Sequence, residues 1–220
     1  MMKKQKVSSA VIRRLPRYYR HLNDLHQAGV ERISSNALGA SLGLTASQIR
    51  QDLSCFGEFG QQGYGYNVSS LRDEVADILG VNRGHSAVIL GVGNLGRALM
   101  ENFHFDRFGV TLAAAFDVVP EIVGRSCSGV PVYHTDQLED YLTQHPANIG
   151  VLTVPGRVAN RVAERLVSAG VKGIWNFTNI ELTVDAPDIV VEDVHFADSL
   201  TRMLGKGELP PAQEDKDGEE

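Results

Sequence analysis

The sequence predicts an α/β protein with a small, mainly helical N-terminal domain followed by a domain built on a parallel sheet. Two observations predict this fold class. In residues 8–53 apolar side chains recur at three- and four-residue spacing, and glycines separate the helical segments. From residue 85 onwards, strand-like apolar runs alternate with helical segments, which is the pattern of βαβ units.

The first predicted helix covers residues 8–28 and ends at Gly29. We expect Pro16 to follow a separate short turn or a kinked start of this helix, because proline cannot donate a helical hydrogen bond. The apolar residues of one face follow the helical period: Val11, Leu15, Tyr18, Leu22 and Leu25.

Two short helices joined by a tight turn follow, which is the arrangement of a helix-turn-helix. The first begins at Ser34 or Ser35 and ends at Gly43. The second begins with Thr45–Gln48, where the Thr hydroxyl and the Gln amide are expected to form a reciprocal capping box. The glycine-rich segment FGEFGQQGYGYNV is typical of a β-hairpin wing, and the helix SSLRDEVADILG follows it. We therefore expect residues 1–80 to form a winged-helix domain.

Charge is distributed unevenly along the chain. Residues 1–50 contain nine Lys or Arg and two Asp or Glu, which gives this segment a net charge of +7. The whole chain has a net charge of −6, so the remaining residues carry −13. A basic N-terminal domain with a helix-turn-helix indicates binding to DNA. The alternative is a solvated basic face on a domain that contacts protein, since helix-turn-helix geometry also occurs there.

The predicted DNA contacts fall into two groups. Gln pairs well with adenine and Arg with guanine, so the second helix should read base edges in the major groove. The arginines of the first helix suit phosphates or a narrow minor groove. The expected DNA-binding residues are Ala46, Ser47, Gln48, Arg50 and Gln51 for bases, Arg13, Arg14 and Arg17 for the backbone or minor groove, and Gly60 in the wing.

Residues 81–194 are predicted to form a Rossmann domain. Its strands are near-continuous apolar runs, which indicates that helices cover both faces of the sheet. The strand SAVIL is followed by Gly91-Val92-Gly93-Asn94-Leu95-Gly96 and then by a helix, which is the context that a G-x-G-x-x-G motif requires. Gly91 permits the tight turn, Gly93 lets a pyrophosphate approach, and Gly96 lets helix and strand pack closely.

An acidic residue completes the dinucleotide motif. Asp117 ends the next strand, 21 residues after Gly96. A carboxylate at this position binds the adenosine ribose hydroxyls of NAD and repels the extra phosphate of NADP. The motif and Asp117 together predict NAD(H) as the ligand.

Several stretches of the chain resemble one family in order and with few gaps, from about residue 8 to residue 204. They are RLPRYYRHL, SSNALGASLGLTASQIRQDLSCFGEFGQQGYGYNV, VILGVGNLGRAL, AAFD, LTVP and GIWNFTNIEL. The chain thereby resembles the Rex family of redox-sensing repressors. The resemblance implies a homodimer that binds palindromic A·T-rich operator DNA when NADH is scarce and is released when NADH binds. It also implies a domain-swapped C-terminal helix, within residues 195–206.

Two positions depart from the family pattern. Gln51 stands where many relatives carry Lys in the recognition helix. His195 stands where many carry an Asp that pairs with a Tyr near the nicotinamide, and Glu101-Asn102-Phe103 contains no such Tyr. The family ion pair is therefore not transferred. We expect instead a mostly apolar nicotinamide pocket that favours the neutral ring of NADH. Its expected lining is Phe103, Phe105, Val154, Pro155, Phe177 and Thr178.

The remaining features set limits on function. No apolar run reaches the roughly 18 residues of a membrane span, the N-terminus lacks a signal-peptide core, and the only cysteines are Cys55 and Cys127, so we expect a cytoplasmic protein. We expect no metal site, and the segment RSCSGVP is expected to be a loop. Residues 207–220 are acidic and rich in Pro and Gly, which is typical of a disordered tail.

Two other functions fit parts of the pattern. A small NAD-dependent dehydrogenase would share the Rossmann domain, but no substrate domain and no Tyr-x-x-x-Lys pair is evident. A coenzyme A-binding protein could share the fold, although Asp117 favours a ribose without a phosphate. We therefore expect a regulator rather than an enzyme.

Overall fold

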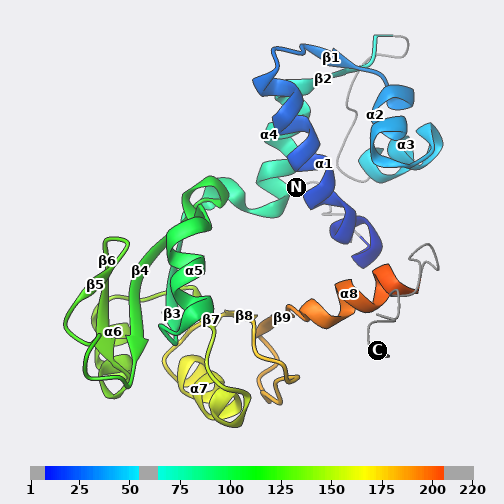
Figure 1. The fold of residues 1–220 in the computed structure, drawn as a ribbon. Coiled ribbons are helices and arrows are strands. Elements are labelled where there is room, and N and C mark those ends of the chain that lie inside the picture. Colours follow the sequence, from blue (N-terminus) through cyan, green and yellow to red (C-terminus); the bar gives the residue numbers. More distant parts are fainter. Residues whose placement is uncertain (1–7, 55–63, 206–220) are drawn as a thin grey trace, which may run out of the picture. The chain divides into compact units, whose positions relative to one another are not determined.

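The computed structural model describes residues 8–54 and 64–205. These residues form two compact units (Figure 1). One contains the described residues up to Gly84 together with Asp106–Gly109. The other contains His85–Phe105 together with the described residues from Val110 onwards. Gly80, the last residue of the predicted first domain, ends a helix, and the first unit continues beyond it through a short 3-10 turn.

The first unit is built from four helices and a strand pair among its described residues. Its elements are α1 (Ser9–Gln27), β1 (Arg32–Ile33), α2 (Ser35–Leu42), α3 (Ala46–Ser54), β2 (Tyr66–Asn67), α4 (Val68–Leu79) and η1 (Val81–Arg83). β1 and β2 are antiparallel, with Ile33 opposite Tyr66. The helix-turn-helix followed by an antiparallel strand confirms the winged-helix prediction. Most of the expected wing, including Gly60, lies outside the described residues, as does Cys55.

Helix α1 is continuous through Pro16, so the separate turn expected before this residue is not formed. The Ser8 hydroxyl accepts a hydrogen bond from Val11 N at 3.3 Å and caps the helix eight residues before Pro16. A proline inside a helix costs about 3 kcal/mol. Leu15 and Tyr18 flank Pro16 and are 0% and 1% exposed, and burial of each such side chain contributes roughly 1.5–3 kcal/mol. Packing on both sides of the proline therefore offsets its cost.

The two helices of the helix-turn-helix have defined starts. The Ser34 side chain accepts from Ala37 N at 3.0 Å, and Gly43 ends α2 in the left-handed region at φ 67°. Thr45 Oγ1 accepts from Gln48 N at 3.1 Å. The Gln48 amide does not return to Thr45 but donates to Asp52 Oδ1 at 2.8 Å. Only half of the predicted capping box forms, because a buried carboxylate is the stronger acceptor.

The second unit contains one seven-stranded sheet. Its strands are β3 (His85–Leu90), β4 (Val110–Asp117), β5 (Ser126–Cys127), β6 (Val130–His134), β7 (Ile149–Leu152), β8 (Gly173–Asn176) and β9 (Val190–Asp193). The order is β5-β6-β4-β3-β7-β8-β9, and all pairs are parallel except β5 with β6. Without β5 this is the strand order 3-2-1-4-5-6 of a Rossmann fold, which confirms the prediction.

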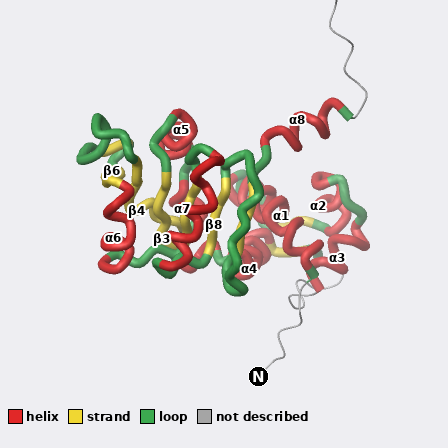
Figure 2. The backbone as a smooth tube through the Cα atoms, turned by 90° about the horizontal axis from the view of Figure 1, so that it is seen from below, coloured by secondary structure: helices red, strands yellow, loops and turns green. Residues whose placement is uncertain are grey.

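Helices cover both faces of the sheet (Figure 2). Along β3, Val88 and Leu90 pack with the cluster that includes α6 (Leu138–Gln144) and α7 (Gly156–Ser168). Ile89, between them, packs with the cluster that includes α5 (Asn94–Asn102). This alternation follows from the two-residue period of a strand. The unit also contains η3 (Thr135–Gln137), and η2 (Phe105–Phe108) follows α5.

The segment RSCSGVP is not a loop. Ser126–Cys127 and Val130–Pro131 pair as a hairpin, and Val130–His134 continues as β6 beside β4. The two-residue turn Ser128-Gly129 has φ values of 50° and 81°. Positive φ at both turn residues matches the twist of the two strands in a tight hairpin. Ser128-Gly129 adopts this conformation, so the segment turns within two residues.

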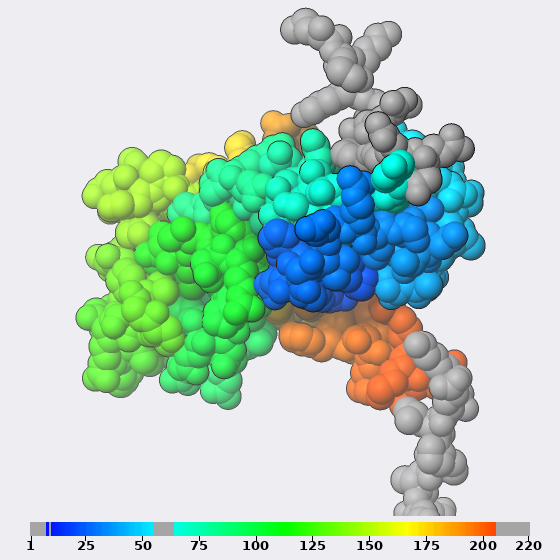
Figure 3. Space-filling view, turned by 90° about the horizontal axis from the view of Figure 1, so that it is seen from above, coloured from blue at the N-terminus to red at the C-terminus, as the bar shows by residue number. Residues whose placement is uncertain are grey.

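The last described helix, α8 (Phe196–Leu204), matches the predicted C-terminal helix. None of its residues is buried, and one face carries four exposed apolar side chains: Phe196, Leu200, Met203 and Leu204. In Figures 1 and 3 it is the orange segment that follows β9. Among the residues that the structure describes, no helix is long and apolar enough to cross a membrane.

Candidate functional site

The glycine motif forms the turn between β3 and α5. Gly91 has φ +100°, and a Cβ there would lie 2.7 Å from the Thr153 carbonyl oxygen. A Cβ on Gly96 would lie only 2.0 Å from the Gly91 oxygen, so helix and strand approach too closely for a side chain. A Cβ on Gly93 would meet nothing within 4 Å. The first and third glycines therefore shape the turn, and the second leaves space for a ligand to reach the backbone.

Asp117 joins this turn to the end of β4. Its Oδ2 accepts from Val92 N at 2.6 Å, and its Oδ1 accepts from Val118 N at 2.7 Å and Val119 N at 3.0 Å. These bonds fix the carboxylate at the carboxyl edge of the sheet. Each carboxylate oxygen can accept more than one hydrogen bond, so acceptor capacity remains for the hydroxyls of a ligand.

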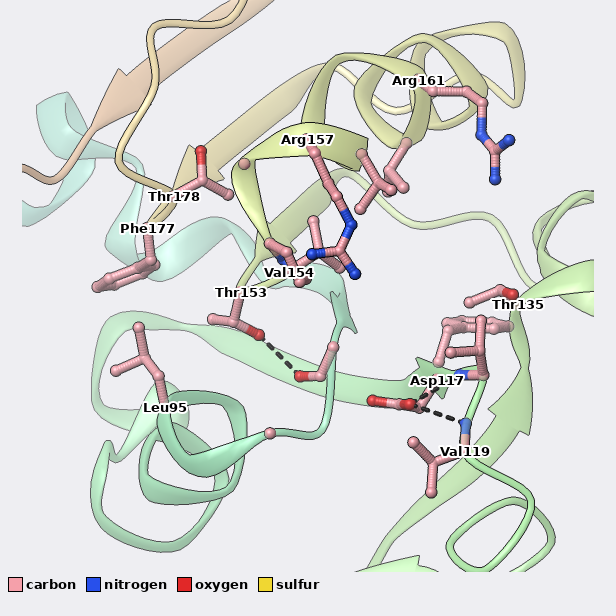
Figure 4. A pocket seen from close by; sticks show the side chains of 18 of the residues that line it. Leu95, Asp117, Val119, Thr135, Thr153, Val154, Arg157, Arg161, Phe177 and Thr178 are labelled. Carbon is pink, nitrogen blue, oxygen red and sulfur yellow. Dashed lines mark hydrogen bonds between the residues drawn. The ribbon is translucent and has the colours of Figure 1, made fainter.

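A cavity of about 660 Å³ opens at this edge of the sheet (Figure 4). Its volume lies within the range usual for small-molecule sites. The predicted site residues that line it are Gly91, Gly93, Leu95, Asp117, Val154, Pro155, Phe177 and Thr178. The cavity lies where strand order reverses between β4, β3 and β7, the usual ligand position in open parallel sheets.

Five other predicted residues do not line this cavity. Val92 and Gly96 are buried within the turn, and Asn94 is exposed at the start of α5. Phe103 packs against Trp175, with ring centroids 5.2 Å apart, and against Phe105, 4.8 Å away. Phe105 is also absent from the lining; it begins η2, and its ring packs in the same aromatic cluster, with its centroid 6.3 Å from that of Trp175.

Sequence reasoning missed three arginines on α7 that line the cavity: Arg157, Arg161 and Arg165. Their four-residue spacing places them on one face of a helix, and that signal was present in the sequence. Arg165 donates to both Glu139 oxygens, with Nη2 2.6 Å from Oε2, and to the Thr135 carbonyl at 2.7 Å. These hydrogen bonds lower the pKa of Glu139 and raise that of Arg165. Arg165 therefore ties α7 to α6.

The far end of the cavity is connected to the segment before α8. Asn176 is fully buried, and its amide donates to Asp193 Oδ1 at 2.6 Å and to the Ile180 carbonyl at 2.8 Å. Its oxygen accepts from Thr178 N and Thr178 Oγ1. The ring of Phe177, which lines the cavity, lies 6.2 Å from that of Phe196 on α8. The cavity wall and the base of α8 thus share contacts.

In the first unit, a buried carboxylate joins α1 to α3. Asp52 is 1% exposed; it accepts two hydrogen bonds from Arg14 at 2.7 Å and one from the Tyr18 hydroxyl at 2.6 Å. Burial alone would raise the pKa of Asp52, but the bonds from Arg14, Tyr18 and Gln48 outweigh it and lower that pKa. Burial and the bond to Asp52 raise the pKa of Tyr18.

This network engages two of the predicted DNA-binding residues, Arg14 and Gln48. The others differ in their contacts. Arg13 is exposed on α1, whose surface appears in dark blue in Figure 3. Arg17 is exposed and donates to the Leu42 carbonyl at 2.9 Å, and Arg50 is exposed and donates to Ser35 Oγ at 3.0 Å. On α3, Ser47 and Gln51 are exposed and Ala46 is half-buried. An exposed, partly cationic surface therefore covers the helix-turn-helix.

Comparison with known proteins agrees with both units. Residues 6–54 match a family described as "Putative DNA-binding protein N-terminus", and residues 82–180 match a family described as "CoA binding domain". The chain is 44% identical over 204 residues to a redox-sensing transcriptional repressor Rex of Clostridium botulinum strain Eklund 17B, covering 93% of this chain and 97% of the relative. A Rex of strain Hall is 48% identical over 203 residues, with coverage of 92% and 96%.

The chain belongs to the Rex family. Solved structures of a Rex-family repressor called RSP have the same fold. One, in complex with β-NAD+ and operator DNA, has a TM-score of 0.86 at 45% identity and covers 91% of this chain and 92% of its own. Another, in complex with β-NADH, has a TM-score of 0.84 at 42% identity, with coverage of 91% and 94%. As a Rex, the chain is a member of a family of redox-sensing transcriptional repressors.

Proposed function

We propose that this Rex binds NAD(H) in the cavity of its Rossmann domain and A·T-rich palindromic operator DNA through its winged-helix domain, and that NADH releases it from DNA. The observation that carries the proposal is the cavity bounded by the glycine turn and Asp117. It is supported by the RSP structures, whose ligands are NADH in one case and NAD+ with operator DNA in another.

The residues present fit the dinucleotide. The open space at Gly93 accommodates a diphosphate beside the free N–H groups at the start of α5, where partial positive charge favours anions. Asp117 would accept hydrogen bonds from the adenosine ribose hydroxyls. Val154, Pro155 and Phe177 provide apolar contacts for the nicotinamide end. The dinucleotide would supply a redox signal through the charge of its nicotinamide ring, which is neutral in NADH and cationic in NAD+.

Discrimination between NADH and NAD+ must come from the ring, because both forms share the glycine turn and Asp117. Burial of an unpaired cation against apolar side chains is costly, so this end of the cavity favours the neutral ring. A ligand shifts a conformational equilibrium only through different affinity for the two states. NADH is therefore expected to stabilise the arrangement of the dimer that does not fit DNA.

For DNA, the exposed α3 residues Ser47, Arg50 and Gln51 suit the major groove, and Arg13 and Arg17 suit the phosphates or minor groove. The role of Arg14 and Gln48 is then to hold α1 against α3 through Asp52. Ala46 and Gly60 remain proposed contacts. A repressor of this type is expected to act in the cytoplasm and to catalyse no reaction.

A homodimer follows from the need to occupy two half-sites of a palindrome. The four exposed apolar side chains of α8 support the proposal that this helix inserts into the partner subunit, as the family resemblance implies. Insertion would bury a surface that is costly to leave in water.

The test is an electrophoretic mobility shift on an A·T-rich palindrome, titrated with NADH and with NAD+. NADH should release the protein at lower concentration than NAD+, and equal effects at matched saturation would contradict the sensing proposal. Arg50→Ala should weaken DNA binding and preserve NADH binding. Arg83→Ala, which removes a surface arginine outside α1–α3, is the matched control.

Coenzyme A is a second candidate ligand, because the matched family is described as a CoA binding domain. Asp117 favours NAD(H), since coenzyme A carries a phosphate on its ribose that a carboxylate would repel. Calorimetric titration with coenzyme A under the same conditions distinguishes the two. Tighter binding of coenzyme A than of NADH would overturn the proposal.

A further inference from the structure

Arg157 and Arg161 are cations in the cavity wall that neither the glycine motif nor Asp117 accounts for. Arg165, one turn further along α7 than Arg161, is held by Glu139 and the Thr135 carbonyl through its Nε and Nη2 atoms. Arg157 and Arg161 are exposed, and no hydrogen bond or ion pair joins either guanidinium to another residue in the described part of the chain. An unpaired guanidinium in a ligand cavity has its donors available to the ligand.

The two side chains point in different directions. Figure 4 shows Arg157 leaving the first turn of α7 and extending into the cavity, above Val154 and toward the side on which Asp117 lies. Arg161 lies on the following turn and extends toward the edge of the cavity that carries Thr135. The glycine turn and α5 form the wall on the other side of the cavity from α7. Arg157 therefore extends from the α7 side into the cavity that Gly93 also lines.

The charges in this space are unbalanced for a dinucleotide. A diphosphate carries two negative charges, and on the glycine side it meets only backbone N–H groups and the partial charge of α5, worth about half a unit charge. Asp117 adds a negative charge nearby. A guanidinium presents a planar fork that matches two phosphate oxygens. Among the lining residues, Arg157 has a positive charge, hydrogen-bond donors without a partner in the described part of the chain, and a side chain that extends into the cavity, so it is suited to bind the diphosphate.

We infer that Arg157 binds the diphosphate of the dinucleotide from the α7 side of the cavity, opposite the glycine turn. The inference rests on the proposed function and deepens it by naming the residue that neutralises the ligand. Arg161, which extends to the Thr135 edge, does not contact the diphosphate.

The test compares the full chain with Arg157→Gln and Arg161→Gln by calorimetric titration with NADH, ADP-ribose and adenosine. Both variants lose one positive charge from the same helix, so a general effect of charge would appear in both. Arg157→Gln should weaken NADH and ADP-ribose about 10- to 100-fold, the usual effect of losing hydrogen bonds to a charged group, and adenosine less than about threefold. Arg161→Gln should change NADH and ADP-ribose binding by less than about threefold.

A second measurement separates binding from folding. In the absence of nucleotide, Arg157→Gln should bind operator DNA as the unaltered chain does, and release should need about 10- to 100-fold more NADH. Unchanged binding of ADP-ribose to Arg157→Gln would overturn the inference and leave the proposed function standing. An equal loss for adenosine would also overturn it, since it would assign Arg157 to the adenine ring. If the unaltered chain bound neither NADH nor ADP-ribose, the proposed function would fail, and the inference with it.

Discussion

Asp117 Oδ2 accepts a hydrogen bond from Val92 N at 2.6 Å, so the residue predicted to bind the ribose also fixes the turn predicted to bind the diphosphate. The two parts of the dinucleotide site are thus one hydrogen-bonded structure. A ligand that contacts both meets backbone groups that are already in place, which reduces the entropy lost on binding.

Asp117→Ala should therefore reduce NADH affinity by about 100-fold or more, because it removes the ribose acceptors and leaves Val92 N without its partner. Operator binding without nucleotide should persist, since Asp117 lies in the second unit. Calorimetry and mobility shifts measure the two effects. Asp140→Ala removes an exposed carboxylate from α6, outside the cavity lining, and should change neither. Loss of DNA binding in Asp117→Ala would contradict this division.

Gly93 and Gly96 form a matched pair for separating ligand binding from folding. Gly93→Ala adds a methyl group into open space, so it should leave the thermal midpoint unchanged and weaken NADH about tenfold or more by occupying the diphosphate position. Gly96→Ala places a Cβ 2.0 Å from the Gly91 oxygen and should destabilise the protein by more than about 2 kcal/mol. Thermal unfolding and NADH titration of both variants test this. Equal stability losses would contradict the assigned roles.

The sequence predicted these glycines well because their roles depend on the local backbone. The same holds for α2 and α3, whose starts are determined by Ser34 and Thr45. By contrast, β6 was missed because a short strand with a proline beside a two-residue turn carries little apolar pattern. The continuity of α1 through Pro16 depends on burial of Leu15 and Tyr18, which is a tertiary effect.

The site shows the same distinction. Asp117 could be found by its spacing from the glycines, whereas Arg157 follows a strand from a different part of the chain and meets them only in the folded sheet. The partners of Arg14 and Gln48 were unpredictable for the same reason, since Asp52 is 38 residues from Arg14. The sequence shows that a basic residue lies on a helix, but it does not show whether that residue pairs with another side chain of the protein or is available to DNA.

The Asp52 network predicts a stability that depends on pH. The pKa of Asp52 is lowered in the folded protein, so its ion pair stabilises the fold fully above the ordinary pKa near 3.8 and less as pH falls through the folded value. Asp52→Asn should cost about 3–5 kcal/mol at neutral pH, because it removes the negative charge that pairs with Arg14 at this buried position. The difference in unfolding free energy between the unaltered chain and this variant should narrow below about pH 4.

Urea unfolding at a series of pH values measures this difference. The matched control is Asp73→Asn, whose carboxylate pairs with Arg72 at an exposed site and should change stability by less than about 1 kcal/mol. A second consequence is that Asp52→Asn should weaken operator binding through the position of α3, with NADH affinity unchanged. A pH-independent difference would show that Asp52 acts through packing alone.

The apolar face of α8 should determine the oligomeric state. Leu200 is 54% exposed and lies between Phe196 and Met203 on that face, so Leu200→Glu would place a charge in the proposed dimer contact. A charge buried without a partner destabilises association by several kcal/mol, and the variant should sediment as a monomer at concentrations where the unaltered chain is a dimer. Because each monomer then binds only one half-site, operator affinity should fall steeply while each unit remains folded.

The control is Asp198→Ala, which removes a charge from the same helix outside its four apolar side chains and should leave the protein dimeric. Dimeric Leu200→Glu with normal operator binding would show that the subunits associate through another surface.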